Sequence, residues 1–245
     1  MSRKKGWIYM STDDNTILDA ADLSMMQLSD SFFPTGMYSM SNGLEAIFYS
    51  GKKIKAEELR ELVKTYLEYQ IGPADCNALG NAYEHATRSN LAKLLEVDRV
   101  IFSMKLVQEI RDASIRSGTQ LLRCIRSFSG NKILGQYEDA IRGGQALGPY
   151  PVALAVAANA FLIPKEKAAL VMLYSFSVSI VGAALRLGML QHFDGQKVID
   201  ELKPTIVKVV KANINRPIEG IWQFAPSIDV IQISHERMNS KMFIT

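Results

Sequence analysis

The 245-residue sequence has little cysteine, little surplus charge and no apolar segment behind its basic start. Its two cysteines, Cys76 and Cys124, lack the spacing of a disulfide framework or a zinc site, so we expect a reducing, cytoplasmic environment. The polar residues 11–15 that follow the first basic cluster argue against a secretory signal peptide. The net charge of +3 is too small to indicate nucleic-acid binding.

The sequence also lacks the local motifs on which common catalytic sites are built. It has no phosphate-binding P-loop and no Gly-x-Ser-x-Gly nucleophile elbow, and its loop glycines lack the dinucleotide-binding spacing. The three histidines share no helix face, and Asn239 stands where a zinc-protease motif starting at His235 needs a second histidine. We therefore expect a binding protein that is not an enzyme and holds no metal or cofactor. A helical enzyme with dispersed catalytic residues is the alternative.

Charge is unevenly distributed along the chain. From Gly143 to Leu190 only four residues are charged, whereas the chain average of 22% would give about ten. Within this stretch, Ala168–Leu185 contains no charge and is just long enough to cross a bilayer, but serines and a glycine dilute it. We interpret it as a buried core helix, with a membrane span or interfacial contact as alternatives.

Helical periodicity dominates the rest of the sequence. Apolar residues recur at intervals of three and four around Leu59–Leu67 and Leu91–Val107, and no segment alternates as a strand would. Glycines and prolines, such as Gly72-Pro73, are expected to end helices, and Asp194-Gly195 is interpreted as a turn before a helix. The prediction is an all-α, single-domain bundle of roughly eight to ten helices over residues 23–245, after a flexible segment at 1–22.

Four segments carry more specific information. The first, Leu23–Glu45, reads LSMMQLSDSFFPTGMYSMSNGLE, in which Ser39 and Ser41 suit helix caps and Gly43 permits close backbone approach. The second is RDASIRSGTQLLR, residues 111–123. The third begins an alanine-rich helix at Tyr150-Pro151-Val152 and includes the end of the apolar helix that follows, residues 173–187. The fourth is PSIDVIQISHERMNSKMF, residues 226–243. In this order they resemble the urease accessory protein UreF family. The chain departs from the family pattern at Met37, where a second glycine is usual, and at Lys241, where arginine is common.

The resemblance implies an accessory protein without catalytic activity that acts in maturation of the nickel enzyme urease. Family members dimerise and bridge the accessory proteins UreH (also called UreD) and the GTPase UreG, and the assembly delivers nickel to apo-urease with GTP hydrolysis. The complex, rather than this chain alone, is expected to handle nickel. No membrane or nucleic-acid partner is expected.

The resemblance also selects candidate partner-binding residues, each with a structural alternative. They are Pro34, Gly36, Tyr38, Ser39, Gly43, Glu45, Arg111, Ser114, Gly118, Arg186, His235 and Glu236.

For several candidates the alternatives can be stated physically. Arg111, Ser114 and Gly118 share a helix face, which suits a tight helix crossing or a partner. The opposite face of that helix is basic. It is either a surface exposed to solvent or a docking surface for an acidic partner. Arg186 requires an ion pair or a functional contact, because an unpaired guanidinium in apolar surroundings is costly. His235 is either a packing residue or a partner contact, whereas Glu236 lies beside its apolar stripe. We expect Gly143–Leu190 to supply core and dimer surface.

Overall fold

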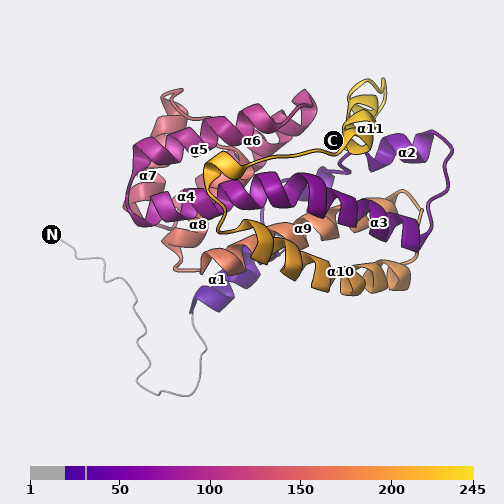
Figure 1. Cartoon of the computed structure of the whole chain (residues 1–245), viewed down its shortest axis with the longest axis horizontal. Helices are drawn as coiled ribbons and strands as arrows, with labels where there is room; N and C mark the ends of the chain where they lie inside the picture. Colours follow the sequence, from indigo (N-terminus) through magenta and orange to yellow (C-terminus); the bar gives the residue numbers. More distant parts are fainter. Residues whose placement is uncertain (1–19, 31) are drawn as a thin grey trace, which may run out of the picture.

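The computed structural model describes residues 20–30 and 32–245, and every regular element within them is helical (Figure 1). The elements are α1 (Ala20–Ser29), η1 (Met37–Ser39), α2 (Leu44–Tyr49), α3 (Ala56–Tyr66), η2 (Leu67–Cys76), α4 (Asn77–Thr87), α5 (Leu91–Met104), α6 (Gln108–Arg126), α7 (Lys132–Arg142), α8 (Tyr150–Ala160), α9 (Lys165–Arg186), α10 (His192–Asn213), η3 (Ile218–Gly220) and α11 (Pro226–Glu236). Because η2 joins α3 to α4, the eleven α-helices form ten separate rods in the described chain. The all-α prediction is confirmed.

The start of the bundle differs slightly from the expected boundary. Residues 20–22, assigned to the flexible segment, form the first turn of α1, and Asp22 is ion-paired to Lys167 at 2.7 Å. Residues 1–19 lie outside the described part of the chain. Helix α1 therefore packs on α9 as part of the bundle.

Helices α8 and α9 form the centre of the core. Tyr150–Ala158 is buried on every side, between α4 and α6, which is the environment that a helix with no polar face requires. Helix α9 packs against α8, α10 and α1, and 67% of its most apolar stretch is buried. Each large aliphatic side chain buried in this way contributes about 1.5–3 kcal/mol. The core-helix interpretation of Ala168–Leu185 is confirmed.

The expected break at Gly72-Pro73 is wrong. The chain continues through it as the π-helical segment η2, with Pro73 inside the helix. Pro73 has no N–H to donate within the helix, and two amides of a distant segment bond to this stretch: Phe224 donates to the Tyr69 carbonyl at 2.9 Å, and Trp222 donates to the Pro73 carbonyl at 3.4 Å. The segment after η3 thus hydrogen-bonds to the backbone of η2 around the proline. Asp194 and Gly195 likewise lie within the first turn of α10 rather than in a turn before it.

Helix α6 crosses the start of α8 at very short range. A Cβ atom on Gly118 would lie 2.0 Å from the Gly148 carbonyl oxygen, and Ser114 Oγ accepts a hydrogen bond from the Tyr150 amide at 3.1 Å. The loop before α8 is fixed by the buried carboxylate of Asp98, which accepts from the Gly148 amide at 2.9 Å. The stripe of small residues on α6 therefore forms a helix crossing within the chain.

This crossing predicts the effect of adding a single methyl group. Gly118→Ala is expected to lower the free energy of unfolding by about 1–3 kcal/mol, because the backbone of residues 148–150 must move away. Thermal unfolding followed by circular dichroism measures the change. Gly182→Ala is the matched control, since a Cβ on this helical glycine has no heavy atom within 4 Å. Equal unfolding temperatures for the two variants would contradict the close crossing.

Candidate functional site

The C-terminal tail, residues 237–245, docks on the first of the four sequence segments, although about 200 residues separate them. We call that first segment, Leu23–Glu45, the N-terminal motif. The Ile244 amide donates to the Ser39 carbonyl at 2.8 Å, and the Ser41 amide donates to the Thr245 carbonyl at 2.8 Å. Ser41 Oγ also donates to the Thr245 carbonyl. Figure 1 shows the chain end lying close to α11 and α2. The first and last segments of the predicted site therefore form one structure.

Glu45 holds this structure together from the first turn of α2. Its side chain is fully buried, and its carboxylate accepts hydrogen bonds from the Met242 amide at 2.7 Å and the Phe243 amide at 3.0 Å. Burial raises the pKa of the Glu45 carboxyl, but these two amides and His235 outweigh burial, so the pKa lies below its ordinary value. The carboxylate is therefore kept charged in the interior by donors from the tail and α11.

His235 lies between two carboxylates. Its Nε2 is 3.0 Å from Glu45 Oε2, and its Nδ1 is 2.7 Å from Glu109 Oε2 on α6. Lys241 Nζ donates to Glu109 Oε1 at 2.8 Å and to the Glu236 carbonyl at 3.1 Å. Both ring nitrogens of His235 thus face carboxylate oxygens, one from α2 and one from α6. We call Glu45, Glu109, His235 and Lys241 the clasp.

Arg186, at the end of α9, is stacked between two aromatic rings. Its Cζ lies 4.0 Å from the ring centre of Tyr38 and 4.4 Å from that of Phe243. Its Nε donates to the Gly182 carbonyl at 3.1 Å, but its buried Nη2 has no hydrogen-bond partner. No carboxylate of the described residues lies within 4.0 Å, so the expected structural ion pair does not form. Burial lowers the pKa of the guanidinium, and Tyr38 opposes that shift.

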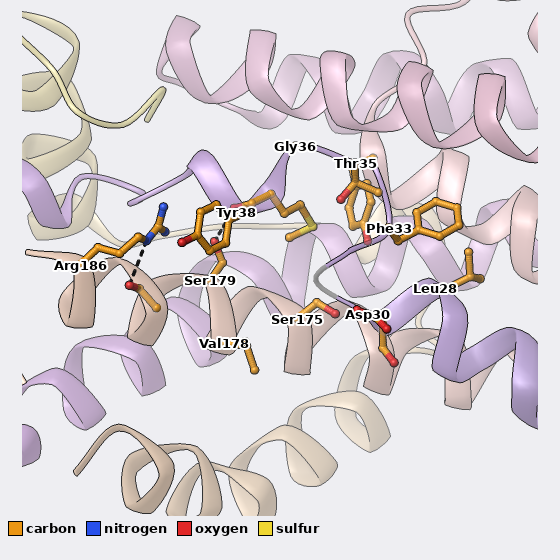
Figure 2. A pocket seen from close by; sticks show the side chains of 14 residues that line it. Leu28, Asp30, Phe33, Thr35, Gly36, Tyr38, Ser175, Val178, Ser179 and Arg186 are labelled. Atoms are coloured by element: carbon orange, nitrogen blue, oxygen red, sulfur yellow. Dashed lines mark hydrogen bonds between the residues drawn. The ribbon is translucent and has the colours of Figure 1, made fainter. Parts of the chain in front are cut away.

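A groove runs along α9 from Arg186 toward the end of α1 (Figure 2). It encloses about 180 Å³ and contains a second buried polar atom without a partner, Ser175 Oγ. Ser179 Oγ donates to the Met37 carbonyl at 2.8 Å and fixes the N-terminal motif over the groove. We call this feature the α9 groove. It presents one cationic and several hydroxyl groups between apolar walls.

The structure brings most of the N-terminal candidates together. Tyr38 contacts Arg186, Ser39 bonds to the tail, and Glu45 contacts His235 and the tail, as described above. Gly43 packs against α11 so closely that a Cβ would lie 2.7 Å from Ile231 Cγ2. Gly36 lines the α9 groove with φ +77°, and the adjoining Pro34 is exposed.

The two departures from the family pattern have local solutions. Met37 starts η1 without a positive φ, because Gly36 supplies the left-handed residue of the turn. Lys241 reaches two acceptors with one ammonium group, where an arginine would use its planar fork. The two expected helix caps differ in outcome. Ser39 Oγ donates to the Gly36 carbonyl and caps no helix, whereas Ser41 Oγ accepts from the Glu45 amide in the first turn of α2 at 3.4 Å.

The α6 candidates lie apart from the clasp. Arg111 donates to the carbonyls of Lys105 at 2.7 Å and Leu106 at 3.0 Å, which fixes the connection between α5 and α6. Ser114 and Gly118 face α8. Glu236 is exposed and accepts from the Glu109 amide at 3.3 Å. These internal contacts leave a role in partner binding as a prediction for the three α6 residues.

Sequence reasoning missed Glu109 and Phe243. Glu109 precedes the recognisable stripe of α6 by only two residues, but its contact with His235 spans 126 positions. Phe243 is only the last residue of the fourth motif in the sequence. Nothing in a single sequence indicates that its ring covers Arg186.

Comparisons with known proteins bear on the family resemblance. Residues 54–203 match the UreF family. The chain is 29% identical over 221 residues to "Urease accessory protein UreF" of Trichodesmium erythraeum, covering 90% of this chain and 95% of the relative. It is 27% identical over 223 residues to the protein of that name from Bacillus sp. strain TB-90, covering 91% and 98%. It is 29% identical over 222 residues to "Urease accessory protein UreF 1" of Brucella melitensis, covering 91% and 92%.

The clasp predicts that Glu45→Gln releases the tail. Replacing the carboxylate leaves His235 with one anionic partner and sets an amide NH₂ against backbone donors. This change is expected to lower the free energy that holds the tail in place by about 2–3 kcal/mol. The tail amides should then exchange roughly 30- to 150-fold faster. Hydrogen exchange at Met242, Phe243 and Ile244 measures the effect. Glu236→Gln, at an exposed position, should leave these rates almost unchanged; unaltered exchange in Glu45→Gln would contradict the assignment.

The lowered pKa of Glu45 predicts acid sensitivity of the same contacts. An undocked tail leaves Glu45 with its ordinary pKa of 4.5, so below that pH the undocked state takes up the proton first. Tail docking should be fully stable above pH 4.5 and weaken as pH falls through the lower pKa of the docked state. Amide protection factors measured from neutral to acidic pH test this. In Glu45→Gln the part of the loss of protection that comes from protonation of Glu45 should be absent. Identical pH profiles of amide protection in the variant and the unsubstituted chain would contradict the prediction.

Proposed function

The chain belongs to the UreF family of urease accessory proteins, and on that premise we propose that it is an adaptor in the insertion of nickel into apo-urease. In this proposal it forms a homodimer in the cytoplasm, binds the accessory protein UreH (UreD) and the GTPase UreG, and couples GTP hydrolysis by UreG to nickel delivery. Proteins of this family are accessory proteins rather than enzymes. A dispersed catalytic site is therefore not proposed.

The observation that carries the proposal is the joining of the N-terminal motif, the end of α9 and the tail into one surface. Tyr38 is 65% exposed beside a cation whose Nη2 has no acceptor in the described chain. Arg186 as a whole is partly exposed, so a partner that supplies a carbonyl or carboxylate to the exposed part of its guanidinium gains a charge-assisted hydrogen bond. Aromatic and arginine residues at the edge of a groove are typical anchors of protein interfaces. The geometry suits recognition of another protein.

Nickel enters the proposal as cargo of the assembly. No group of three histidine, cysteine, aspartate or glutamate side chains is placed to hold a metal ion within residues 20–30 and 32–245. The clasp uses both nitrogens of His235 and both carboxylates for internal contacts. We therefore propose that partners hold the ion while this chain positions them.

The membrane alternative concerns α9 alone. This helix is long and apolar enough to cross a bilayer, but most of its apolar stretch is packed inside the bundle. Facing lipid would require α8, α10 and α1 to separate from it. We propose that the protein stays in the soluble fraction without detergent, and recovery only with membranes would favour the alternative.

The proposal predicts that Arg186→Ala and His235→Ala impair complex formation. Arg186→Ala removes the unsatisfied donor, and His235→Ala removes the link between α11 and Glu45. In pull-down experiments each variant should capture UreG and UreH (UreD) in amounts lower by a factor of about ten or more, because a charged hydrogen bond contributes about 1.5–3 kcal/mol. Each variant should also activate urease less.

Two controls make this experiment decisive. Circular dichroism establishes that each variant is folded, and Arg88→Ala removes an arginine whose side chain is 70% exposed on α4. Arg88→Ala should bind and activate as the unsubstituted protein does. If the folded Arg186 and His235 variants also did so, these residues would not belong to the partner surface.

A further inference from the structure

A second hollow lies at the other end of α2. It encloses about 800 Å³ between the α2–α3 loop and the turn that joins α9 to α10. These two connections lie at the same end of the molecule in Figure 1. Phe48, Met189 and Leu190 contribute its apolar wall, and Lys52, Lys53 and Lys55 line its rim. It shares no lining residue with the α9 groove.

The charges on this rim are not balanced. No carboxylate of the described residues lies within 4.0 Å of the Lys52, Lys53 or Lys55 ammonium groups. The hollow also contains Glu57 and Asp194, but each lies in the first turn of a helix, α3 or α10. A helix N-terminus stabilises such a carboxylate with its own partial positive charge. The hollow thus carries three lysines against two carboxylates, and within the described chain none of the three ammonium groups is held in an ion pair.

Exposed aromatic side chains accompany the lysines. Phe48 is 37% exposed and is in edge-to-face contact with Tyr49, which is 60% exposed. Phe193, adjacent to Asp194, is 90% exposed. Solvent-exposed aromatic rings beside a concave apolar wall are typical of protein-binding surfaces.

We propose that this hollow, the lysine hollow, is a second docking surface and receives an acidic segment of a partner protein that carries a bulky apolar side chain. The apolar side chain fills the space beside Phe48, Met189 and Leu190, while carboxylates face the lysines. A protein segment can place its acidic groups away from Glu57 and Asp194, whereas a uniformly anionic lipid surface cannot. The inference rests on the proposed function, because UreH (UreD) and UreG are the partners to be tested.

The experiment measures binding of purified UreH (UreD) and UreG, separately and together, to the full chain. The triple variant Lys52→Glu/Lys53→Glu/Lys55→Glu reverses the rim charge, and Phe48→Ala shortens the wall. Lys203→Glu/Lys208→Glu/Lys211→Glu on exposed positions of α10 is the control with the same charge change. We expect the rim variant to lower affinity for one partner by at least about tenfold, Phe48→Ala to lower affinity for that partner too, and the control to have little effect. Raising salt from about 50 to about 300 mM should weaken wild-type binding.

The outcomes separate this inference from the proposed function. If the unsubstituted chain binds its partners and the rim variant binds both of them with the same affinity, the lysine hollow is not a docking surface. That result would leave the proposed function intact. Failure of the unsubstituted chain to bind either partner would overturn the proposed function and, with it, this inference. Phosphatidylserine vesicles that bind the unsubstituted chain but not the rim variant, with partner binding unchanged, would assign the lysines to a lipid surface and overturn the protein-docking inference.

Discussion

The site depends on a charge buried where no water reaches it. Moving a carboxylate into a protein interior costs several kcal/mol unless donors replace its hydration. Glu45 recovers this cost from His235 and two tail amides, which belong to elements that follow it by about 190 residues or more. These contacts depend on one another, because an undocked tail would remove both of the amides that donate to the Glu45 carboxylate. Helix α2, α11, the tail and, through Glu109, α6 thus adopt one mutual arrangement.

The elements that follow from local pattern were predictable from the sequence. The uncharged run of α9, the apolar stripe of α6 and the absence of alternating strands all have counterparts in the described structure. Gly72-Pro73 shows where such reasoning fails. A helix usually ends there because proline removes a donor, but here Phe224 donates to Tyr69 from a distant segment. The exception depends on tertiary contact, which no local window contains.

The candidate site shows the same division between local and distant signals. The ordered motifs identified Tyr38, Glu45, Arg186 and His235, and the fold brings all of them to the tail. Their chemistry could not be deduced, since the expected ion pair of Arg186 is instead a stack between two rings. Glu109 escaped notice for the same reason. A residue that acts by completing another residue's hydrogen bonds has no signature of its own in one sequence.

The docked tail also has a consequence for protein synthesis. A ribosome makes residues 39–45 early, but their hydrogen-bond partners at 242–245 are made about 200 residues later. Contacts of such long sequence separation form late, because loop closure must precede them. The helices of the bundle can pack while the chain is still being made, whereas the clasp cannot. A nascent chain thus cannot form the contacts that dock the tail until residues 242–245 have left the ribosome.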